Sequence, residues 1–137
     1  MNKKILILCT GNSCRSQIAE GFFNHYRNDW EAYSAGVSPS RVHPMAIEVM
    51  NEVGIDISGK RSKSVEEFLK ESFDYVITVC DDARESCPIF PGKAEMIHWS
   101  FTDPDKTIGS REERLIAFRK VRDQIDEKIK DFLNREK

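Results

Sequence analysis

Residues 3–19 read KKILILCTGNSCRSQIA, an apolar run that leads through a polar loop into a second apolar segment. The run up to Leu8 is apolar from Ile5 onward, which is typical of a strand buried on both faces of a parallel sheet. Beyond the loop, apolar side chains recur three and four residues apart and predict an amphipathic helix over residues 16–27. A strand that enters a helix through a tight loop opens a βαβ unit, so this stretch predicts an α/β fold.

The rest of the chain continues the alternation of strands and helices. After the first strand, over residues 3–8, we expect strands over residues 31–35, 74–79 and 94–98, and helices over residues 44–53 and 65–70. A last helix is expected to start at Ser110, because Glu113 three residues later completes a capping box. This order predicts a three-layer fold, in which a four-stranded parallel sheet has helices on both faces.

Composition narrows the functional classes. A length of 137 residues predicts one catalytic domain over residues 1–137, since domains typically take about 100–200 residues. The 21 basic and 23 acidic residues give a net charge of −2, which argues against a nucleic-acid partner. The first apolar run is shorter than the roughly 7–15 residues of a signal-peptide core, so we expect a cytoplasmic protein without membrane contact.

The loop over residues 9–16 carries the strongest chemical signal, a cysteine followed by five residues, an arginine and a serine. A loop that wraps into a helix N-terminus aims several backbone N–H groups at one point, and the helix dipole adds positive potential there. Arg15 supplies a planar fork for two oxygens of a tetrahedral oxyanion, and the same field stabilises a Cys9 thiolate as nucleophile. Gly11 and Asn12 tolerate the positive φ angles that such a cradle needs. The candidate oxyanion-binding residues are Thr10, Gly11, Asn12, Ser13, Cys14, Arg15 and Ser16.

Two other interpretations compete with the hypothesis of an oxyanion site. Cys9 could be a buried cysteine at a strand end and Arg15 a surface charge, although the position between a strand and a helix disfavours that reading. Residues 54–60 also match a nucleotide-binding P-loop up to its last position, which here is Arg61 instead of Ser or Thr. That segment follows a helix rather than a strand, so ATP binding is disfavoured.

Cys80, Cys87 and Asp103 are the remaining candidates. Ligands of open α/β sheets bind beyond the carboxyl ends of the strands, where we expect Cys9, Cys80 and Asp103 to gather. Cys80 and Cys87, with a polar and mobile segment between them, could form a resolving pair that exchanges disulfides with Cys9. They could also be unrelated thiols, and their six-residue gap fits zinc poorly. Asp103 could transfer a proton at the anion site, or simply form a turn with Pro104.

Residues 8–17, LCTGNSCRSQ, resemble the start of the low-molecular-weight tyrosine phosphatase superfamily and, within it, the thioredoxin-coupled arsenate reductases. The further matches are residues 19–21 (AEG), 33–36 (YSAG), 54–58 (GIDIS), 79–80 (VC), 87–88 (CP), 98–99 (HW), 103–104 (DP) and 121–123 (VRD). Gln17 and the pair Cys80 and Cys87 favour the reductases, because the phosphatases usually have proline after Arg-Ser and lack that pair. The resemblance covers nearly the whole chain.

The resemblance implies a reaction sequence. Cys9 attacks arsenate held by the loop and Arg15, with Asp103 assisting proton transfer. Cys80 then attacks Cys9 and releases arsenite, and Cys87 converts the Cys9–Cys80 disulfide into a Cys80–Cys87 disulfide. Thioredoxin, an external reductant, reduces that disulfide. The resemblance further implies phosphate or sulfate as mimics of arsenate, no tightly bound cofactor and no metal; we expect a monomer.

The resemblance also leaves alternatives and one departure. A phosphatase would use Cys9, Arg15 and Asp103 without Cys80, and an anion or redox sensor would bind oxyanions without turnover. Some of the reductases bind a potassium ion beside the loop, and Asn12, Glu20 and Ser34 match the neighbours of that ion. Lys63 stands where those reductases have an acid. We therefore predict that the potassium site is lost or filled by the Lys63 ammonium.

Overall fold

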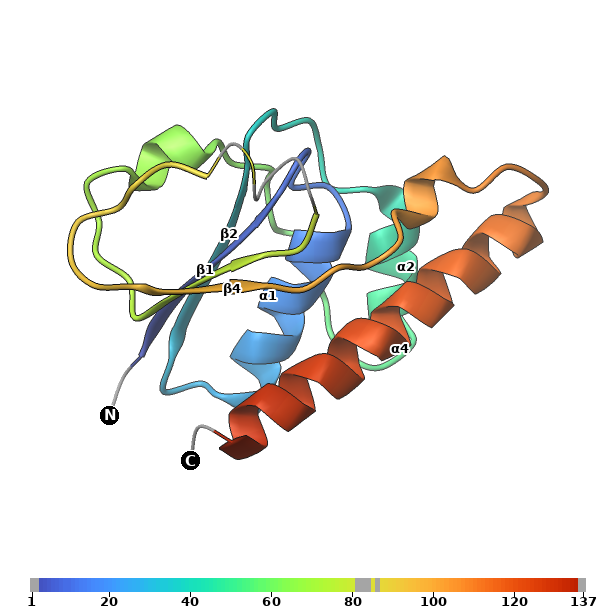
Figure 1. Ribbon diagram of the computed structural model, residues 1–137. Coiled ribbons are helices and arrows are strands. Elements are labelled where there is room, and N and C mark those ends of the chain that lie inside the picture. The colour runs from blue at the N-terminus through green and yellow to red at the C-terminus, as the bar shows by residue number, and fades with distance from the viewer. Residues whose placement is uncertain (1–2, 81–84, 86, 136–137) are drawn as a thin grey trace.

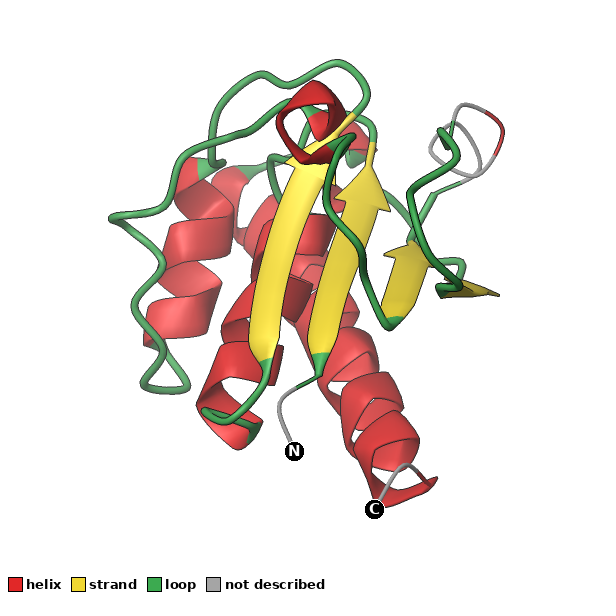
Figure 2. Cartoon of the chain, turned by 90° about the vertical axis from the view of Figure 1, so that its left-hand side faces the viewer, coloured by secondary structure: helices red, strands yellow, loops and turns green. Residues whose placement is uncertain are grey.

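The parallel sheet is built as the sequence predicts. The structure is a computed structural model, which describes residues 3–80, 85 and 87–135. Its strands are β1 (Lys4–Cys9), β2 (Glu31–Gly36), β3 (Tyr75–Thr78) and β4 (Glu95–His98). They run parallel in the order β2-β1-β3-β4 (Figure 2). The four predicted strands are confirmed, with ends shifted by at most one residue.

The helices follow the predicted order too. They are α1 (Arg15–Tyr26), α2 (Pro44–Asn51) and α4 (Arg111–Arg135), together with two short 3₁₀ helices, η1 (Val65–Phe68) and η2 (Pro104–Lys106). The predicted capping box is confirmed, because the Glu113 N–H donates to Ser110 Oγ at 3.1 Å and the Ser110 N–H donates to Glu113 Oε1 at 3.2 Å. The helix expected over residues 65–70 is the shorter η1, and η2 was not predicted.

Two neighbouring residues of β2 show that the sheet is covered on both faces. Ser34 donates a hydrogen bond to Glu20 of α1, whereas the ring of Tyr33 packs against Phe68 of η1. Successive side chains of a strand point to opposite faces, so α1 and η1 lie on opposite sides of the sheet. Helix α4 packs on α1 and α2 packs on α4, as Figure 1 shows. This arrangement confirms the three-layer architecture.

The core lies along β1, the strand flanked by β2 and β3. Residues 5–8 of β1 are fully buried, as the continuous apolar run predicts. An aromatic cluster between the sheet, α1 and α4 contains Phe23, Trp30, Tyr75, Trp99 and Phe132. Strand β4 is an edge strand, and its Glu95 and Met96 are exposed. Within the described residues, no helix is long and apolar enough to cross a membrane.

Candidate active site

The loop over residues 9–14 turns closely from β1 into α1, and Gly36 makes the room for it. Gly36 ends β2 beside Cys9 in the sheet register. A Cβ atom at Gly36 would lie 2.5 Å from the Thr10 carbonyl oxygen and 2.8 Å from the Asn12 nitrogen. Any larger residue would therefore displace the loop. In the sequence, Gly36 stands out only as the last residue of the 33–36 match, YSAG.

Asn12 has the unusual backbone conformation that turns the loop. Its φ of 49° lies in the left-handed region, which asparagine tolerates better than most residues. Gly11 also tolerates such angles but does not use this freedom, since it is not among the positive-φ glycines. Gln17 Nε2 donates to Asn12 Oδ1 at 3.0 Å, and the Lys63 backbone N–H donates to the same oxygen at 2.9 Å. These bonds, one from the first turn of α1 and one from the distant Lys63, hold Asn12 in its unusual conformation, so the loop shape depends partly on tertiary contacts.

The Cys9 sulfur is buried at the floor of the loop and faces hydrogen-bond donors. The Asn12 N–H donates to it at 3.2 Å, and Ser16 Oγ lies 2.9 Å away. The Asn12 side-chain amide donates to Ser16 Oγ at 2.8 Å, which leaves the Ser16 hydroxyl proton free to point at the sulfur. Donors directed at sulfur stabilise the thiolate over the thiol. The geometry therefore suits a nucleophilic cysteine.

Arg15 and Asp103 lie together at the opening of the loop, as the sheet topology predicts. An Arg15 guanidinium nitrogen lies 3.5 Å from Asp103 Oδ2, and another donates to the Phe101 carbonyl at 3.1 Å. Arg15 Nε is buried without a hydrogen-bond partner. A buried unpaired donor costs free energy, and an oxyanion in the loop could satisfy it.

Cys14 lies against the same carboxylate. Its thiol donates to Asp103 Oδ1 at 3.8 Å. Burial and then the negative charge of Asp103 raise the pKa of the Cys14 thiol well above its ordinary value. Cys14 therefore stays protonated at neutral pH and acts as a donor within the loop, in contrast to the donor-rich setting of Cys9.

The second predicted thiol, Cys80, lies beside the loop. Cys80 Sγ is buried and is 3.3 Å from the hydroxyl of Thr10, the residue next to Cys9. The register of β1 and β3 pairs Leu8 with Thr78, so Cys80 stands one residue beyond the position level with Cys9. Cys9 and Cys80 therefore lie at the carboxyl ends of neighbouring strands.

Cys87 is the least buried of the four cysteines. Its thiol is half-buried and donates to the Pro88 carbonyl at 3.5 Å, and burial raises its pKa. All four thiols are free. The predicted mobile segment between Cys80 and Cys87 lies, apart from Glu85, outside the described residues.

Glu20 is a buried carboxylate that already faces two ammonium groups. Lys60 Nζ lies 3.3 Å from Glu20 Oε2, and Lys63 Nζ lies 3.8 Å from Oε1. Ser34 Oγ also donates to Oε1, at 2.8 Å. Burial lowers the pKa of Lys63, and the charge of Glu20 opposes that shift. A further cation here would meet two positive charges, so these residues do not fit a bound potassium ion.

We therefore expect the rate of catalytic turnover to change less than about twofold when potassium replaces choline at constant ionic strength. The reason is that the site at Glu20 does not favour the ion. Lys63→Met should lower the free energy of unfolding by about 1–2 kcal/mol, since it leaves Glu20 less well paired. Urea denaturation measures this loss. Lys70→Met, at an exposed lysine outside this cluster, is the matched control. Strong activation by potassium would contradict the assignment.

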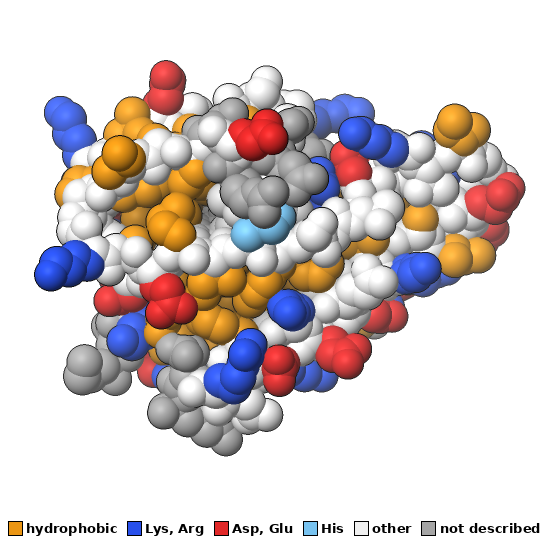
Figure 3. Space-filling model, viewed as in Figure 1, with side chains coloured by type: hydrophobic (Ala, Val, Ile, Leu, Met, Phe, Trp, Pro, Cys, Tyr) orange, Lys and Arg blue, Asp and Glu red, His pale blue; other side chains and the backbone are white. Residues whose placement is uncertain are grey.

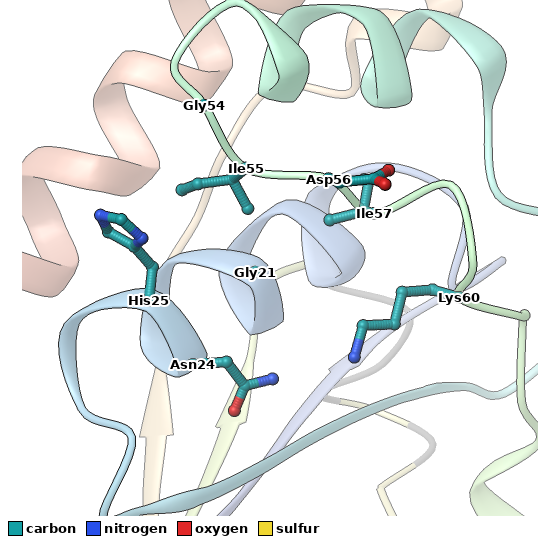
Figure 4. A pocket seen from close by; sticks show the side chains of 8 residues that line it. All are labelled: Gly21, Asn24, His25, Gly54, Ile55, Asp56, Ile57 and Lys60. Carbon is teal, nitrogen blue, oxygen red and sulfur yellow. The ribbon is translucent and has the colours of Figure 1, made fainter.

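A separate pocket of about 290 Å³ opens beside the second half of α1 (Figure 4). It contains none of the predicted site residues and is lined by Gly21, Asn24, His25, Gly54, Ile55, Asp56, Ile57 and Lys60. The segment that resembles a P-loop forms one wall. Its lysine pairs with Glu20, so it is engaged in the ion pair described above. Within the described residues, no three His, Cys, Asp or Glu side chains gather to hold a metal ion.

The structure and the sequence together define a class: parallel α/β proteins with a cysteine–arginine oxyanion loop between the first strand and the first helix. The family described as low molecular weight phosphotyrosine protein phosphatase matches residues 4–137. The chain belongs to this family. The low molecular weight protein tyrosine phosphatase of T. tengcongensis shares the fold with a TM-score of 0.80 and 30% identity, over 97% of this chain and 99% of that one.

Arsenate reductases are prominent among the relatives. The arsenate reductase of Shouchella clausii is 50% identical over 134 residues, 96% of each chain. A structure described as an arsenate reductase in the phosphate binding state gives a TM-score of 0.79 with 36% identity, over 97% of this chain and 98% of that one. The thioredoxin-dependent arsenate reductase of Corynebacterium glutamicum gives 0.75 with 29% identity, over 96% of this chain and 60% of that one.

Proposed function

We propose that this protein reduces arsenate to arsenite, with electrons from its own cysteines and then from thioredoxin. The observation that carries the proposal is the position of Cys80, whose sulfur lies 3.3 Å from the Thr10 hydroxyl at the edge of the Cys9 loop. A phosphatase needs only the cysteine in the loop, whereas a reductase needs a second thiol within reach. The curated relatives named as arsenate reductases support the same conclusion.

In the first step, the Cys9 thiolate attacks the arsenic atom of arsenate bound in the loop. The backbone N–H groups of the loop and the Arg15 fork hold the oxyanion, as they would hold phosphate. Asp103, beside Arg15, donates the proton with which an arsenate oxygen leaves as water. The product is a covalent Cys9–arsenate adduct in which arsenic is still pentavalent.

In the second step, Cys80 attacks the sulfur of Cys9. The bond between sulfur and arsenic breaks with its electron pair going to arsenic, so arsenite leaves and a Cys9–Cys80 disulfide forms. Cys87 then attacks Cys80, which frees the Cys9 thiolate and leaves a Cys80–Cys87 disulfide. The Cys87 step is ordinary attack of a thiolate on a disulfide, whereas the Cys80 step displaces arsenite from the Cys9 sulfur. Two thiols lose two electrons, which balances the reduction of arsenic.

Thioredoxin, a dithiol protein, then reduces the Cys80–Cys87 disulfide. Cys87 is half-buried, while Cys9, Cys14 and Cys80 are buried, so Cys87 offers the reductant the most accessible sulfur. Ile89, two residues on, is 97% exposed and offers an apolar contact to a partner. Figure 3 shows hydrophobic side chains gathered around a hollow at the end of the molecule that carries η1. We propose that the enzyme works as a monomer.

Cys87→Ser separates the steps and tests the proposal. When arsenate is added once and thioredoxin is absent, this variant should release about one molecule of arsenite per chain, because Cys80 can still attack Cys9. Peptide mapping by mass spectrometry should then find a Cys9–Cys80 disulfide. The wild type with thioredoxin, thioredoxin reductase and NADPH should turn over repeatedly. No arsenite release from either protein would refute the reductase function.

Phosphomonoester hydrolysis is the second candidate function, because Cys9, Arg15 and Asp103 assemble without Cys80. The wild type should be assayed with p-nitrophenyl phosphate in parallel. Hydrolysis without any arsenate turnover would identify a phosphatase, whereas hydrolysis alongside turnover would reflect the shared loop chemistry.

A further inference from the structure

His43 joins the oxyanion loop to the segment that carries Asp103. Its backbone N–H donates to the Ser13 carbonyl of the loop at 2.9 Å. Its ring caps α2, because Nδ1 accepts the Met45 N–H at 3.0 Å. Since Nδ1 is an acceptor, the neutral ring carries its proton on Nε2. Nε2 lies 2.8 Å from Asp105 Oδ1, so it donates to that carboxylate.

Asp105 connects His43 to Asp103. The Asp105 backbone N–H donates to Asp103 Oδ1 at 3.0 Å, within the turn that forms η2. Arg114 of α4 donates to the same oxygen, Asp105 Oδ1, at 3.1 Å. Figure 1 shows η2 beside the start of α2. Asp105 is thus held between α2 and α4, two residues from the proposed proton donor.

The His43 end of this bond is largely buried, whereas Asp105 is half exposed. The His43 side chain is 16% exposed, and its ring packs on Phe118 with ring centroids 4.8 Å apart. The packing fixes the ring, and a hydrogen bond to a charged carboxylate is shorter and stronger than one between neutral groups. The ring cannot tilt away without losing both the helix cap and the packing on Phe118.

We propose that His43 is a positioning residue, which acts through Asp105 to hold Asp103 at the distance from the oxyanion loop that proton transfer needs. This inference rests on the proposed reduction of arsenate and adds a residue to its machinery. His43 connects the oxyanion loop to the turn that carries Asp103, because its backbone binds the loop and its side chain binds the turn.

Two substitutions separate the helix cap from the bond to Asp105. His43→Asn keeps an oxygen that can accept the Met45 N–H, but it is too short to reach Asp105. His43→Gln places an amide nitrogen near the position of Nε2 and keeps that bond, but it loses the cap. We expect His43→Asn to lower kcat/KM for arsenate about tenfold, because small displacements of a reacting group have effects of this order. His43→Gln should keep most of the activity and have the lower Tm.

A double-mutant cycle with Asp103→Asn tests whether His43 acts through Asp103. The tenfold loss should shrink to less than about twofold in the Asp103→Asn background, since the group being positioned is already disabled. An equal loss in both backgrounds, or full activity of His43→Asn, would overturn the proposal. A merely structural role would instead make the variant with the lower Tm the less active one.

A second measurement needs no substrate. The carboxyl ¹³C resonance of Asp103 in the reduced protein should shift in His43→Asn and stay in place in His43→Gln. An unchanged resonance in both variants would overturn the proposal even if the wild type did not reduce arsenate. A wild type that lacks turnover but shows the expected shift would refute the proposed function alone.

Discussion

Cys80→Ser is expected to abolish the release of arsenite, with a loss of at least about 10³-fold in turnover, because the hydroxyl is a poor nucleophile and cannot form a disulfide. Cys9 alone can form the adduct with arsenate, but it cannot supply both electrons. Arsenite release by this variant should be measured directly in a single turnover, and NADPH oxidation should be followed in the coupled thioredoxin assay. Both signals should disappear.

Hydrolysis of p-nitrophenyl phosphate by Cys80→Ser serves as the control for an intact loop. Serine can keep the contact with the Thr10 hydroxyl at 3.3 Å, so the loop should remain intact. Any hydrolysis of p-nitrophenyl phosphate by the wild type should therefore survive in Cys80→Ser. Arsenite release at the wild-type rate would show that another group is the second reductant and would exclude the proposed cascade.

Arg15→Lys is expected to lower kcat/KM for arsenate by about 10²–10³-fold, the cost typical of losing one preorganised donor to a developing oxyanion. The arginine fork can donate to two oxygens at once, and in the structure its nitrogens face Asp103 and the Phe101 carbonyl. A lysine keeps the charge but has neither the planar fork nor the reach to both groups. Steady-state kinetics across arsenate concentrations should show the loss.

Arg27→Lys is the matched control, because Arg27 pairs with Asp29 just beyond the end of α1 and makes no contact with the loop that the structure describes. It should leave kcat/KM within about twofold of the wild type, as surface pairs contribute little. A loss of less than about threefold in Arg15→Lys would contradict the role of the fork, given the magnitude expected for such donors.

The sequence predicted the fold well because its signals are local. The buried run of β1 is apolar at each of residues 5–8, and the capping box of α4 needs only Ser110 and Glu113. Helix ends were less accurate, since the last residues of a helix depend on packing as well as on propensity. The expected helix over residues 65–70 shortened to η1, which has four residues.

The candidate site was harder to predict where it depends on distant contacts. The order of the first, third and fourth strands was enough to expect Cys9, Cys80 and Asp103 at one end of the sheet. The loop residues alone did not show that Asn12 and not Gly11 would adopt a positive φ, because the distant Lys63 helps Gln17 to hold Asn12. Nor did a local pattern show that His43 reaches Asp105, which lies 62 residues away.

The sequence by itself determined the alternation of strands and helices, the placement of a Cys-x5-Arg loop between the first pair, and the presence of two further thiols and an acid. These features follow from periodicity, spacing and the rule that parallel strands end at one edge. Only the tertiary structure decided which groups touch. It brings Gly36 so close to Thr10 that no side chain would fit, and it places two ammonium groups beside Glu20. It also links His43 to the turn that carries Asp103. Each depends on backbones and side chains far apart in sequence, whose approach is fixed only when the sheet and helices pack.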